Sequence, residues 1–307
     1  FRVEELAVDR SDLQGVQDRF VRVFDLTRAP LLRVAIVDVA GGDRLLLIDM
    51  HHIVTDGVSI GILEREFHQL SQGQALMPLS LQYKDYSEWQ NSAEQRGRVK
   101  EQEAYWLAQL AGDVPVLNLP TDYPRPAIQS YEGANVSFSL SREETEGLRA
   151  LAKTNDITLY MSILSAFSVL LSKLSGQEDI IVGTPIAGRR HPDLEGIVGM
   201  FVNTLVVRSQ VEESDTLRGF LQKIKRTTLD AYEHQDYQFE DLVDKVTFSR
   251  DSSRNPLFDV AFNLLNQMEH KSDISSLSDE AFTHSAGISK FDLTLTAADC
   301  GDQLLLS

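Results

Sequence analysis

The sequence contains a single cysteine, Cys300, among its 307 residues. One thiol excludes an intrachain disulfide and every cysteine-rich metal site, and it is typical of a reducing compartment. Basic residues are also scarce, with 29 lysines and arginines against 46 acidic residues and a formal net charge of −17. This balance disfavours nucleic acid and anionic membrane surfaces as partners. We therefore expect a cytoplasmic protein that binds neither nucleic acid nor a membrane.

Long apolar runs and the signature of a phosphate loop are absent as well. Ile157–Ser172 carries no charged residue, but it is too short and too rich in serine to span a bilayer. We expect no serine nucleophile, although Gly57–Gly61 has the Gly-x-Ser-x-Gly spacing, and the chain has no Gly-Lys-Ser/Thr ending of a phosphate loop. Gly183-Thr184-Pro185 and Gly188 are accordingly interpreted as turn residues.

The composition is that of a globular protein, with 42% hydrophobic and 24% charged residues. A chain of this length usually divides its core, which predicts two domains. Pro120, Pro124 and Pro126 lie close together and mark a connection between domains. We therefore place an N-terminal lobe at residues 1–120 and a C-terminal lobe at residues 121–307. The first residue is Phe1 rather than methionine, so we expect a piece of a longer chain.

Hydrophobic patterns predict alternating strands and helices. Strands are expected at Leu31–Val39 and Arg44–Met50, joined by a glycine-containing hairpin turn, and later at Val136–Leu140, Asp179–Pro185, Phe201–Val207, Phe258–Leu265 and Phe291–Thr296. Helices are expected after Gly57, across Tyr83–Leu110, from a capping box at Ser141–Glu144, over Thr158–Leu174 up to Gly176, and over Leu217–Glu233. The pattern indicates an α/β protein of mixed α+β type, with helices covering its sheets.

The chemistry concentrates in the segment after the second expected strand, His51-His52-Ile53-Val54-Thr55-Asp56-Gly57. Neighbouring strand residues point to opposite faces, so only one histidine can face a given cavity. A reverse turn can carry Asp56 back, and Gly57 allows a backbone conformation that other residues resist. A helix beginning near Val58 would present amide groups suited to a developing oxyanion. These features favour an acyl-transfer site.

Two other interpretations of this segment stay open. A histidine at the end of a strand is most often a surface residue or a hydrogen-bonded core residue. His51, His52 and Asp56 also supply three potential metal ligands, but adjacent strand residues diverge whereas zinc ligands must converge. From the residues alone a structural role is the more common outcome, and no metal is expected.

Five motifs in order give the sequence a family resemblance. His51–Ser59 resembles the His-His-x-x-x-Asp-Gly core of the condensation domains of nonribosomal peptide synthetases. Four further segments match that family, namely Tyr83–Trp89, Val198–Arg208, His234–Glu240 and Arg250–Leu257. Gln238 departs from the pattern, because the family often has proline there. The resemblance extends from about Phe24 to the end of the chain.

The resemblance implies a fold and a reaction. The fold would be a V-shaped pseudo-dimer of two lobes similar to chloramphenicol acetyltransferase, with a tunnel between them. The first lobe would be truncated at its N-terminus and the second lobe at its C-terminal end. Donor and acceptor peptidyl carrier protein domains would deliver thioesters on phosphopantetheine arms. A peptide bond would form between the two substrates, in the biosynthesis of a peptide such as an antibiotic. The chain would bind no cofactor of its own, and an adenylation domain would adjoin it in the same megasynthetase.

The same resemblance implies roles for the residues of the central motif. His52 would be the catalytic residue and His51 its structural neighbour. Asp56 would hold the loop through an ion pair with an arginine from an upstream motif that this chain lacks. Gly57 would bring its backbone close to the tunnel.

Positions outside the two histidines receive implied roles too. Ser59 and Asn203 would line the tunnel, while Asp251 and Arg254 would stabilise the second lobe. Two alternative functions remain. An epimerisation domain of the same superfamily shares the double histidine but is disfavoured by Gly57 and by the Arg-Asp-Ser-Ser-Arg-Asn-Pro-Leu segment. A non-catalytic recruitment module of the same fold is disfavoured because both histidines are intact.

Overall fold

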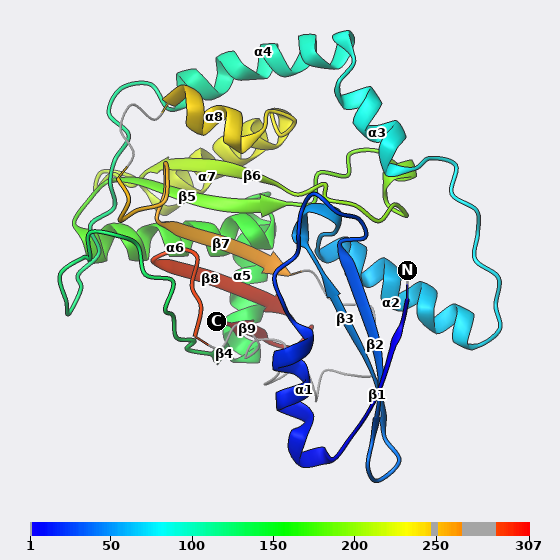
Figure 1. The fold of residues 1–307 in the computed structure, drawn as a ribbon. Coiled ribbons are helices and arrows are strands. Elements are labelled where there is room, and N and C mark those ends of the chain that lie inside the picture. Colours follow the sequence, from blue (N-terminus) through cyan, green and yellow to red (C-terminus); the bar gives the residue numbers. More distant parts are fainter. Residues whose placement is uncertain (1, 247–250, 266–286) are drawn as a thin grey trace. The chain divides into compact units, whose positions relative to one another are not determined.

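The computed structural model describes residues 2–246, 251–265 and 287–307. The chain forms two compact units (Figure 1). The first contains the residues up to Ser92 together with Ala187–Val202, and the second contains Ala93–Ile186 and Asn203–Ser307. The boundary between the two units therefore falls after Ser92, whereas the prolines predicted a lobe boundary at residue 120. The boundary lies earlier in the sequence than predicted because Trp106 and Leu110 belong to a core of the second unit.

A three-stranded sheet organises the first unit. Its strands β1 (Glu4–Val8), β2 (Leu32–Val39) and β3 (Arg44–Met50) lie in that order, with β1 parallel to β2 and β2 antiparallel to β3. The predicted hairpin is confirmed, and Gly41 and Gly42 both have positive φ angles in its turn. Val37 and Val39 face helix α1 (Leu13–Phe20), where Val16 completes a small core.

Two helices follow this sheet in the first unit. Helix α2 (Gly57–Ser71) begins directly after the double-histidine segment, as predicted. Helix α3 (Tyr83–Gln90) ends before Asn91, and α4 (Ala93–Gln109) is a separate helix. The prediction of one long helix across this segment is therefore wrong. The 3-10 helices η1, η2 and η3 span Arg10–Asp12, His52–Val54 and Pro192–Leu194.

The second unit is built on a larger mixed sheet with strand order β4-β9-β8-β7-β5-β6. The bounds are β4 (Phe138–Leu140), β5 (Asp179–Ile186), β6 (Asn203–Gln210), β7 (Val260–Leu265), β8 (Leu293–Asp299) and β9 (Leu304–Leu306). Strands β5 and β7, and β7 and β8, pair in parallel, whereas the other neighbours are antiparallel. Strands β1 and β9 were not predicted, and Arg250 of the last family motif lies outside the described residues.

Helices cover both faces of the larger sheet. Ile180 and Val182 of β5 pack with helices α6 (Leu159–Ser175) and α7 (Leu217–Glu233), whereas Ile181 packs with α4 and the unpredicted helix α8 (Phe239–Val246). This alternation is what a strand buried on two sides requires. The predicted mixed α+β architecture is confirmed.

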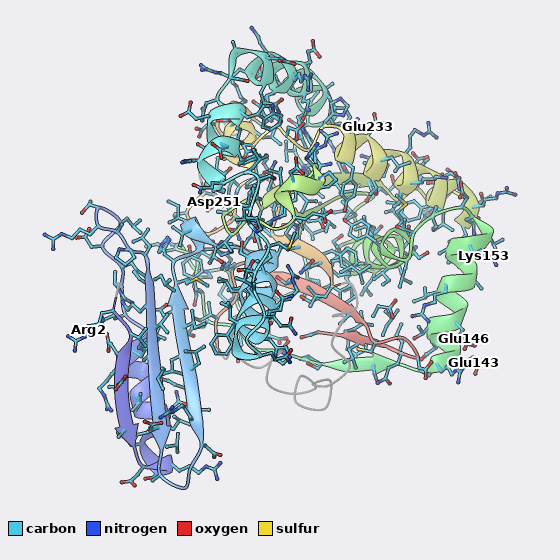
Figure 2. All side chains as sticks on the ribbon, turned by 90° about the vertical axis from the view of Figure 1, so that its right-hand side faces the viewer. Arg2, Glu143, Glu146, Lys153, Glu233 and Asp251 are labelled. Carbon is cyan, nitrogen blue, oxygen red and sulfur yellow. The ribbon has the colours of Figure 1, made fainter. Side chains whose placement is uncertain are left out.

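The capping signals of the second unit are confirmed as well. Helix α5 (Arg142–Thr154) opens with the predicted capping box between Ser141 and Glu144, and α6 ends at Gly176 in the left-handed conformation. Glu143, Glu146 and Lys153 extend outward from α5 (Figure 2). Among the described residues no single helix is long and apolar enough to cross a membrane, although the bent pair α5 and α6 passes on length and composition.

Candidate active site

The two histidines lie where strand β3 ends. The backbone N–H of His51 donates to the carbonyl oxygen of Leu31 at 3.1 Å, which is the last contact of this strand with its neighbour. The ring nitrogen Nδ1 of His51 accepts from the backbone N–H of Ile53 at 3.1 Å. The chain then turns through η2, which begins at His52. His51 therefore caps the turn that carries His52.

The environments of the two imidazoles differ. His51 is half-buried and packs edge to face on Phe24, with ring centroids 6.1 Å apart. His52 is exposed. A half-buried, capped imidazole is held in place by its own contacts, whereas an exposed one can reach a substrate. Of the two imidazoles, that of His52 is the more accessible to solvent.

Asp56 joins the turn to the next helix. Its Oδ1 accepts from the backbone N–H of Ser59 at 2.8 Å and from the Ser59 hydroxyl at 2.7 Å, so Asp56 is the N-cap of α2. The N–H of Ser59 is thus occupied by a carboxylate. The prediction that the first amides of this helix stand free for an oxyanion therefore does not hold at this amide.

The ionic partner of Asp56 is Arg189, on the segment that returns from the second half of the sequence. Nη1 of Arg189 lies 2.6 Å from Oδ2 of Asp56, and Nη2 lies 3.1 Å from Oδ1. The side chains are 4% and 0% exposed. The prediction that the arginine comes from an upstream motif is therefore wrong for this chain, because the bidentate partner lies within it.

Arg189 also binds its own segment. Nη2 donates to the carbonyl oxygen of Ile197 at 3.0 Å, and the guanidinium carbon lies 4.2 Å from the centre of the Phe201 ring. The backbone N–H of Phe201 donates to Oδ2 of Asp56 at 3.1 Å. One carboxylate therefore gathers a guanidinium, a hydroxyl and two backbone amides.

These bonds decide the charge of Asp56. Burial alone would raise the pKa of its carboxyl, but the hydrogen bonds from Arg189, Ser59 and the Phe201 amide outweigh burial and hold the pKa below its usual value. Asp56 is consequently ionised at neutral pH. The Ser59 hydroxyl oxygen also accepts from the Gly199 N–H at 3.0 Å and lies 2.9 Å from the carbonyl oxygen of Gly199, which extends the network.

Two glycines allow this returning segment to fit. Gly188, just before Arg189, has a φ of 65°, and a side chain there would overlap the carbonyl oxygen of Phe201. A Cβ on Gly199 would overlap the ring of Tyr83. The Tyr83 hydroxyl donates to the carbonyl oxygen of Met200 at 2.8 Å. The glycine interpreted as a turn residue at position 188 thus sets up the partner of Asp56.

The backbone of Gly57 does not adopt the special conformation that was predicted for it. It is the first residue of α2, its φ is not in the positive region, and a Cβ there would meet no heavy atom of the described residues within 4 Å. The backbone freedom of glycine is therefore not used at this position. An approach of its backbone to a substrate stays a prediction.

Ser59 and Asn203 were predicted to line a tunnel, and the structure gives both side chains other contacts. The Ser59 hydroxyl is buried between Asp56 and Gly199. The Asn203 amide donates to the carbonyl oxygens of Gln235 and Tyr237 at 2.9 and 2.8 Å, and its oxygen accepts from the Phe239 N–H at 3.1 Å. Both side chains are saturated by protein groups, which explains why neither faces open space.

The other predicted stabilising residues lie in the second unit. Arg254 forms an ion pair with Asp259, and Asp251 accepts from the backbone and hydroxyl of Ser253 at 2.8 and 2.7 Å. The His234–Glu240 motif is bound by α4, where Gln102 accepts from the backbone N–H of Asp236 at 2.9 Å. These contacts hold the second unit together.

A pocket of about 450 Å³ opens beside the histidines in the first unit. It is lined by Arg22, Val23, Phe24, Leu26, Asp49, Met50, His51 and His52. A larger pocket of about 1260 Å³ lies in the second unit and contains neither histidine. Among the described residues no three histidine, cysteine or acidic side chains gather as a metal site would require.

Arg189 was not predicted, although one signal in the sequence pointed to it. Asp56 lies in an apolar-flanked turn and needs a cationic partner if it is buried. Gly188-Arg189-Arg190 is a basic pair after a turn glycine, in a chain with few basic residues. Only the fold, however, shows which arginine reaches the carboxylate.

Comparisons with known proteins agree with this geometry. The family model described as Condensation domain matches residues 1–307, so the chain belongs to the condensation domain family. Bacitracin synthase 3 of Bacillus licheniformis is 48% identical over 299 residues, which cover 97% of this chain and 5% of the synthase. The chain therefore spans a small part of this curated relative.

Solved structures share the fold. A four-domain nonribosomal peptide synthetase bound to AMP and glycine matches with a TM-score of 0.81 and 26% identity, over 100% of this chain and 25% of that one. The X-domain from teicoplanin biosynthesis, solved in complex with OxyB, matches with a TM-score of 0.82 and 21% identity, over 99% and 71%. At that identity the second likeness establishes the fold alone, and the predicted mixed α/β fold class is confirmed.

Proposed function

We propose that this domain forms a peptide bond between two carrier-bound substrates. The amine nitrogen of the acceptor aminoacyl thioester attacks the carbonyl carbon of the donor thioester, and a tetrahedral intermediate forms. Its collapse breaks the C–S bond, the nitrogen loses one proton, and the sulfur of the donor arm takes up one proton. The elongated chain stays on the acceptor arm.

The observation that carries this proposal is the exposed imidazole of His52 on a turn fixed from both sides. His51 caps the turn at its start, and Asp56, bound by Arg189, ends it. A group held in this way loses little conformational entropy when it meets a substrate. The family membership of the whole chain supports the same reaction.

We infer that His52 acts mainly by orientation. An α-amino group has a pKa of about 7.7–8.0, so an appreciable fraction of the acceptor amine is already neutral near pH 7 and needs no base before attack. Positioned proton transfer contributes about 10²–10⁴-fold, while proximity can supply about 7–11 kcal/mol. His52 therefore holds the amine and accepts its proton as the intermediate collapses, and orientation is the larger contribution.

The substrates imply the partners. We propose that donor and acceptor peptidyl carrier domains present their thioesters on phosphopantetheine arms, and that this chain adds no cofactor or metal of its own. An adenylation domain in the same synthetase would supply the activated amino acid, and the assembly would work in the cytoplasm. The curated relative named a bacitracin synthase supports a place in antibiotic peptide synthesis.

A His52→Ala variant of the complete domain tests the proposal, with both carriers loaded and the dipeptidyl acceptor measured. We expect the rate of product formation to fall by about 10²-fold or more. The matched control is His68→Ala, because His68 is another exposed histidine of the first unit, at the far end of α2. Near-normal condensation by the His52 variant would rule the proposal out.

The same assay separates the alternatives. An epimerisation domain would invert a stereocentre on one carrier without joining the two substrates. A recruitment module would bind loaded carriers and leave both thioesters intact. The fold does not decide between these functions, because the X-domain solved with OxyB has the same fold.

A further inference from the structure

The motif Tyr83–Trp89 begins at the first residue of helix α3. The backbone N–H of Gln82 donates to the carboxylate of Asp85 at 2.8 Å, and this hydrogen bond holds the first turn of the helix. Tyr83 extends from that turn. Asp85 therefore fixes the point from which the Tyr83 side chain reaches its neighbours.

Tyr83 contacts three consecutive residues of the segment that returns from the second half of the sequence. Its hydroxyl donates to the carbonyl oxygen of Met200 at 2.8 Å. Its ring lies so close to Gly199 that a Cβ there would overlap it, and it packs edge to face on Phe201, with ring centroids 5.1 Å apart. Tyr83 therefore holds this stretch from one side.

The same stretch binds the Asp56 network from its other side. The Gly199 N–H donates to the Ser59 hydroxyl oxygen at 3.0 Å, and the Phe201 N–H donates to Oδ2 of Asp56 at 3.1 Å. The Phe201 ring also packs on the guanidinium of Arg189. Asp56 is the N-cap at which the double-histidine turn meets α2. A displacement of the stretch would therefore reach that turn through three separate contacts.

The hydroxyl of Tyr83 stays protonated near neutral pH. Burial raises its pKa above the ordinary value of 10.0, and the charge of Asp56 raises it further, while Arg189 has a smaller opposing effect. Tyr83 is 36% exposed, so it is not a core residue. Its hydrogen bond should contribute only about 0.5–1.5 kcal/mol to stability. An effect on the reaction can consequently be separated from an effect on folding.

We propose that Tyr83 is a positioning residue for peptide-bond formation. By fixing Gly199 and Phe201, it keeps Asp56 in the place where the turn holds His52 ready for the acceptor amine. This inference rests on the proposed function. Tyr83 touches no reacting atom in this role, so its loss misaligns His52 without removing a contact to either substrate. The loss should therefore appear in kcat and not in the KM for either carrier.

The test compares Tyr83→Phe and Tyr83→Ala in the complete domain, with both carriers loaded. Tyr83→Phe keeps the ring contacts and should lower kcat by about 3-fold or less, whereas Tyr83→Ala loses the ring and should lower kcat by about 10-fold or more. The KM for each carrier should stay unchanged in both variants. Tyr123→Ala is the matched control, because Tyr123 is 83% exposed, and it should leave kcat unchanged.

A double-mutant cycle with Gly199→Ala tests the contact itself. The three atoms that a Cβ on Gly199 would approach most closely all belong to the Tyr83 ring. Gly199→Ala should therefore lower kcat when Tyr83 is present and have little further effect in the Tyr83→Ala background. Losses that multiply independently would overturn the inference.

The ring signal of His52 in NMR spectra, identified by its loss in His52→Ala, reports the position of the imidazole without turnover. It should shift in Tyr83→Ala and stay in place in Tyr123→Ala. A lower melting temperature of Tyr83→Ala with unchanged kcat and an unshifted His52 signal would make Tyr83 a purely structural residue and overturn the inference. Absence of product from the unmodified domain would instead refute the proposed function, and the His52 signal would still show whether Tyr83 positions the turn.

Discussion

Arg189 binds the carboxylate of Asp56 through two nitrogens, at 2.6 and 3.1 Å, although 133 residues of sequence separate them. This pair joins the helix after the double histidine to a segment that enters the first unit from the second half of the chain. The turn bearing His52 is therefore stabilised by residues far away in the sequence.

Replacing Arg189 with methionine should strongly destabilise the domain. The change leaves the carboxylate of Asp56 buried without its cation, and breaking a buried pair in this way costs about 3–5 kcal/mol of unfolding free energy. Urea unfolding of the complete domain measures the loss. Arg142→Met is the control, because the Arg142–Glu146 pair on α5 is exposed and should contribute no measurable stability. Equal losses in the two variants would contradict the buried role of Arg189.

The contribution of Asp56 should depend on pH. Because its folded-state pKa lies below the ordinary value of 3.8, its charge stabilises the fold above that pH, and this stabilisation is lost as pH falls through the folded-state pKa. We expect Asp56→Asn to lower the melting temperature clearly at pH 7 and progressively less as the pH falls below about 3.8. A difference between the two proteins that stays constant across this range would show that the carboxylate charge is not the stabilising feature.

Gly199→Ala should disturb the same network from its other side. A Cβ at this position would overlap the Tyr83 ring, and overpacking of this kind costs about 1–3 kcal/mol. Because the Gly199 N–H donates to the Ser59 hydroxyl, which binds Asp56, the peptide-forming rate should fall together with the melting temperature. Calorimetry and the two-carrier assay measure the two effects.

Gly147→Ala is the control for this change. Gly147 lies inside helix α5, and a Cβ there would meet no heavy atom of the described residues within 4 Å. Alanine should stabilise that helix by about 0.5–1 kcal/mol. If both alanine variants raised the melting temperature, close packing of Tyr83 on Gly199 would be excluded.

Local signals predicted those parts of the fold that depend on neighbours in sequence. The hairpin at Gly41 and Gly42, the capping box at Ser141 and the end of α6 at Gly176 follow from backbone preferences, and all three are confirmed. The elements that were missed carry weak local signals. Strand β1 begins with two glutamates, α8 has two turns, and β9 has three residues.

The candidate site likewise has some features that local sequence signals predict and others that they do not. The position of the histidines at a strand end and the start of α2 follow from local pattern. The partner of Asp56 depends on where the fold places the segment Ala187–Val202, and no periodic pattern in the sequence predicts that position. Ser59 and Asn203 show a second limit, because polar residues in a motif can serve either a substrate or a buried network, and only the contacts distinguish these roles.

Asn203→Ala should therefore reduce stability and leave substrate binding unchanged. The change removes three hydrogen bonds to the backbone of residues 235–239 and leaves buried carbonyl groups without a donor, at about 1–3 kcal/mol per unsatisfied group. We expect a lower melting temperature with an unaltered KM for either carrier. Asn118→Ala is the control, since Asn118 is exposed. A changed KM at unchanged stability would restore the tunnel-lining role for Asn203.

Arg33→Lys should lower the melting temperature of the domain. A lysine keeps the charge beside Asp49, but one ammonium cannot replace the planar fork that also holds the carbonyl oxygens of Arg22 and Val23. Segment 22–24 then loses hydrogen bonds to Arg33, each of which contributes about 0.5–1.5 kcal/mol, and calorimetry should record a lower melting temperature. The matched control is Arg44→Lys, because Arg44 pairs with Asp38 at the opposite end of the same two strands. If both lysine variants lowered the melting temperature equally, general loosening of the sheet would explain the effect, and the planar fork of Arg33 would have no specific role in holding segment 22–24.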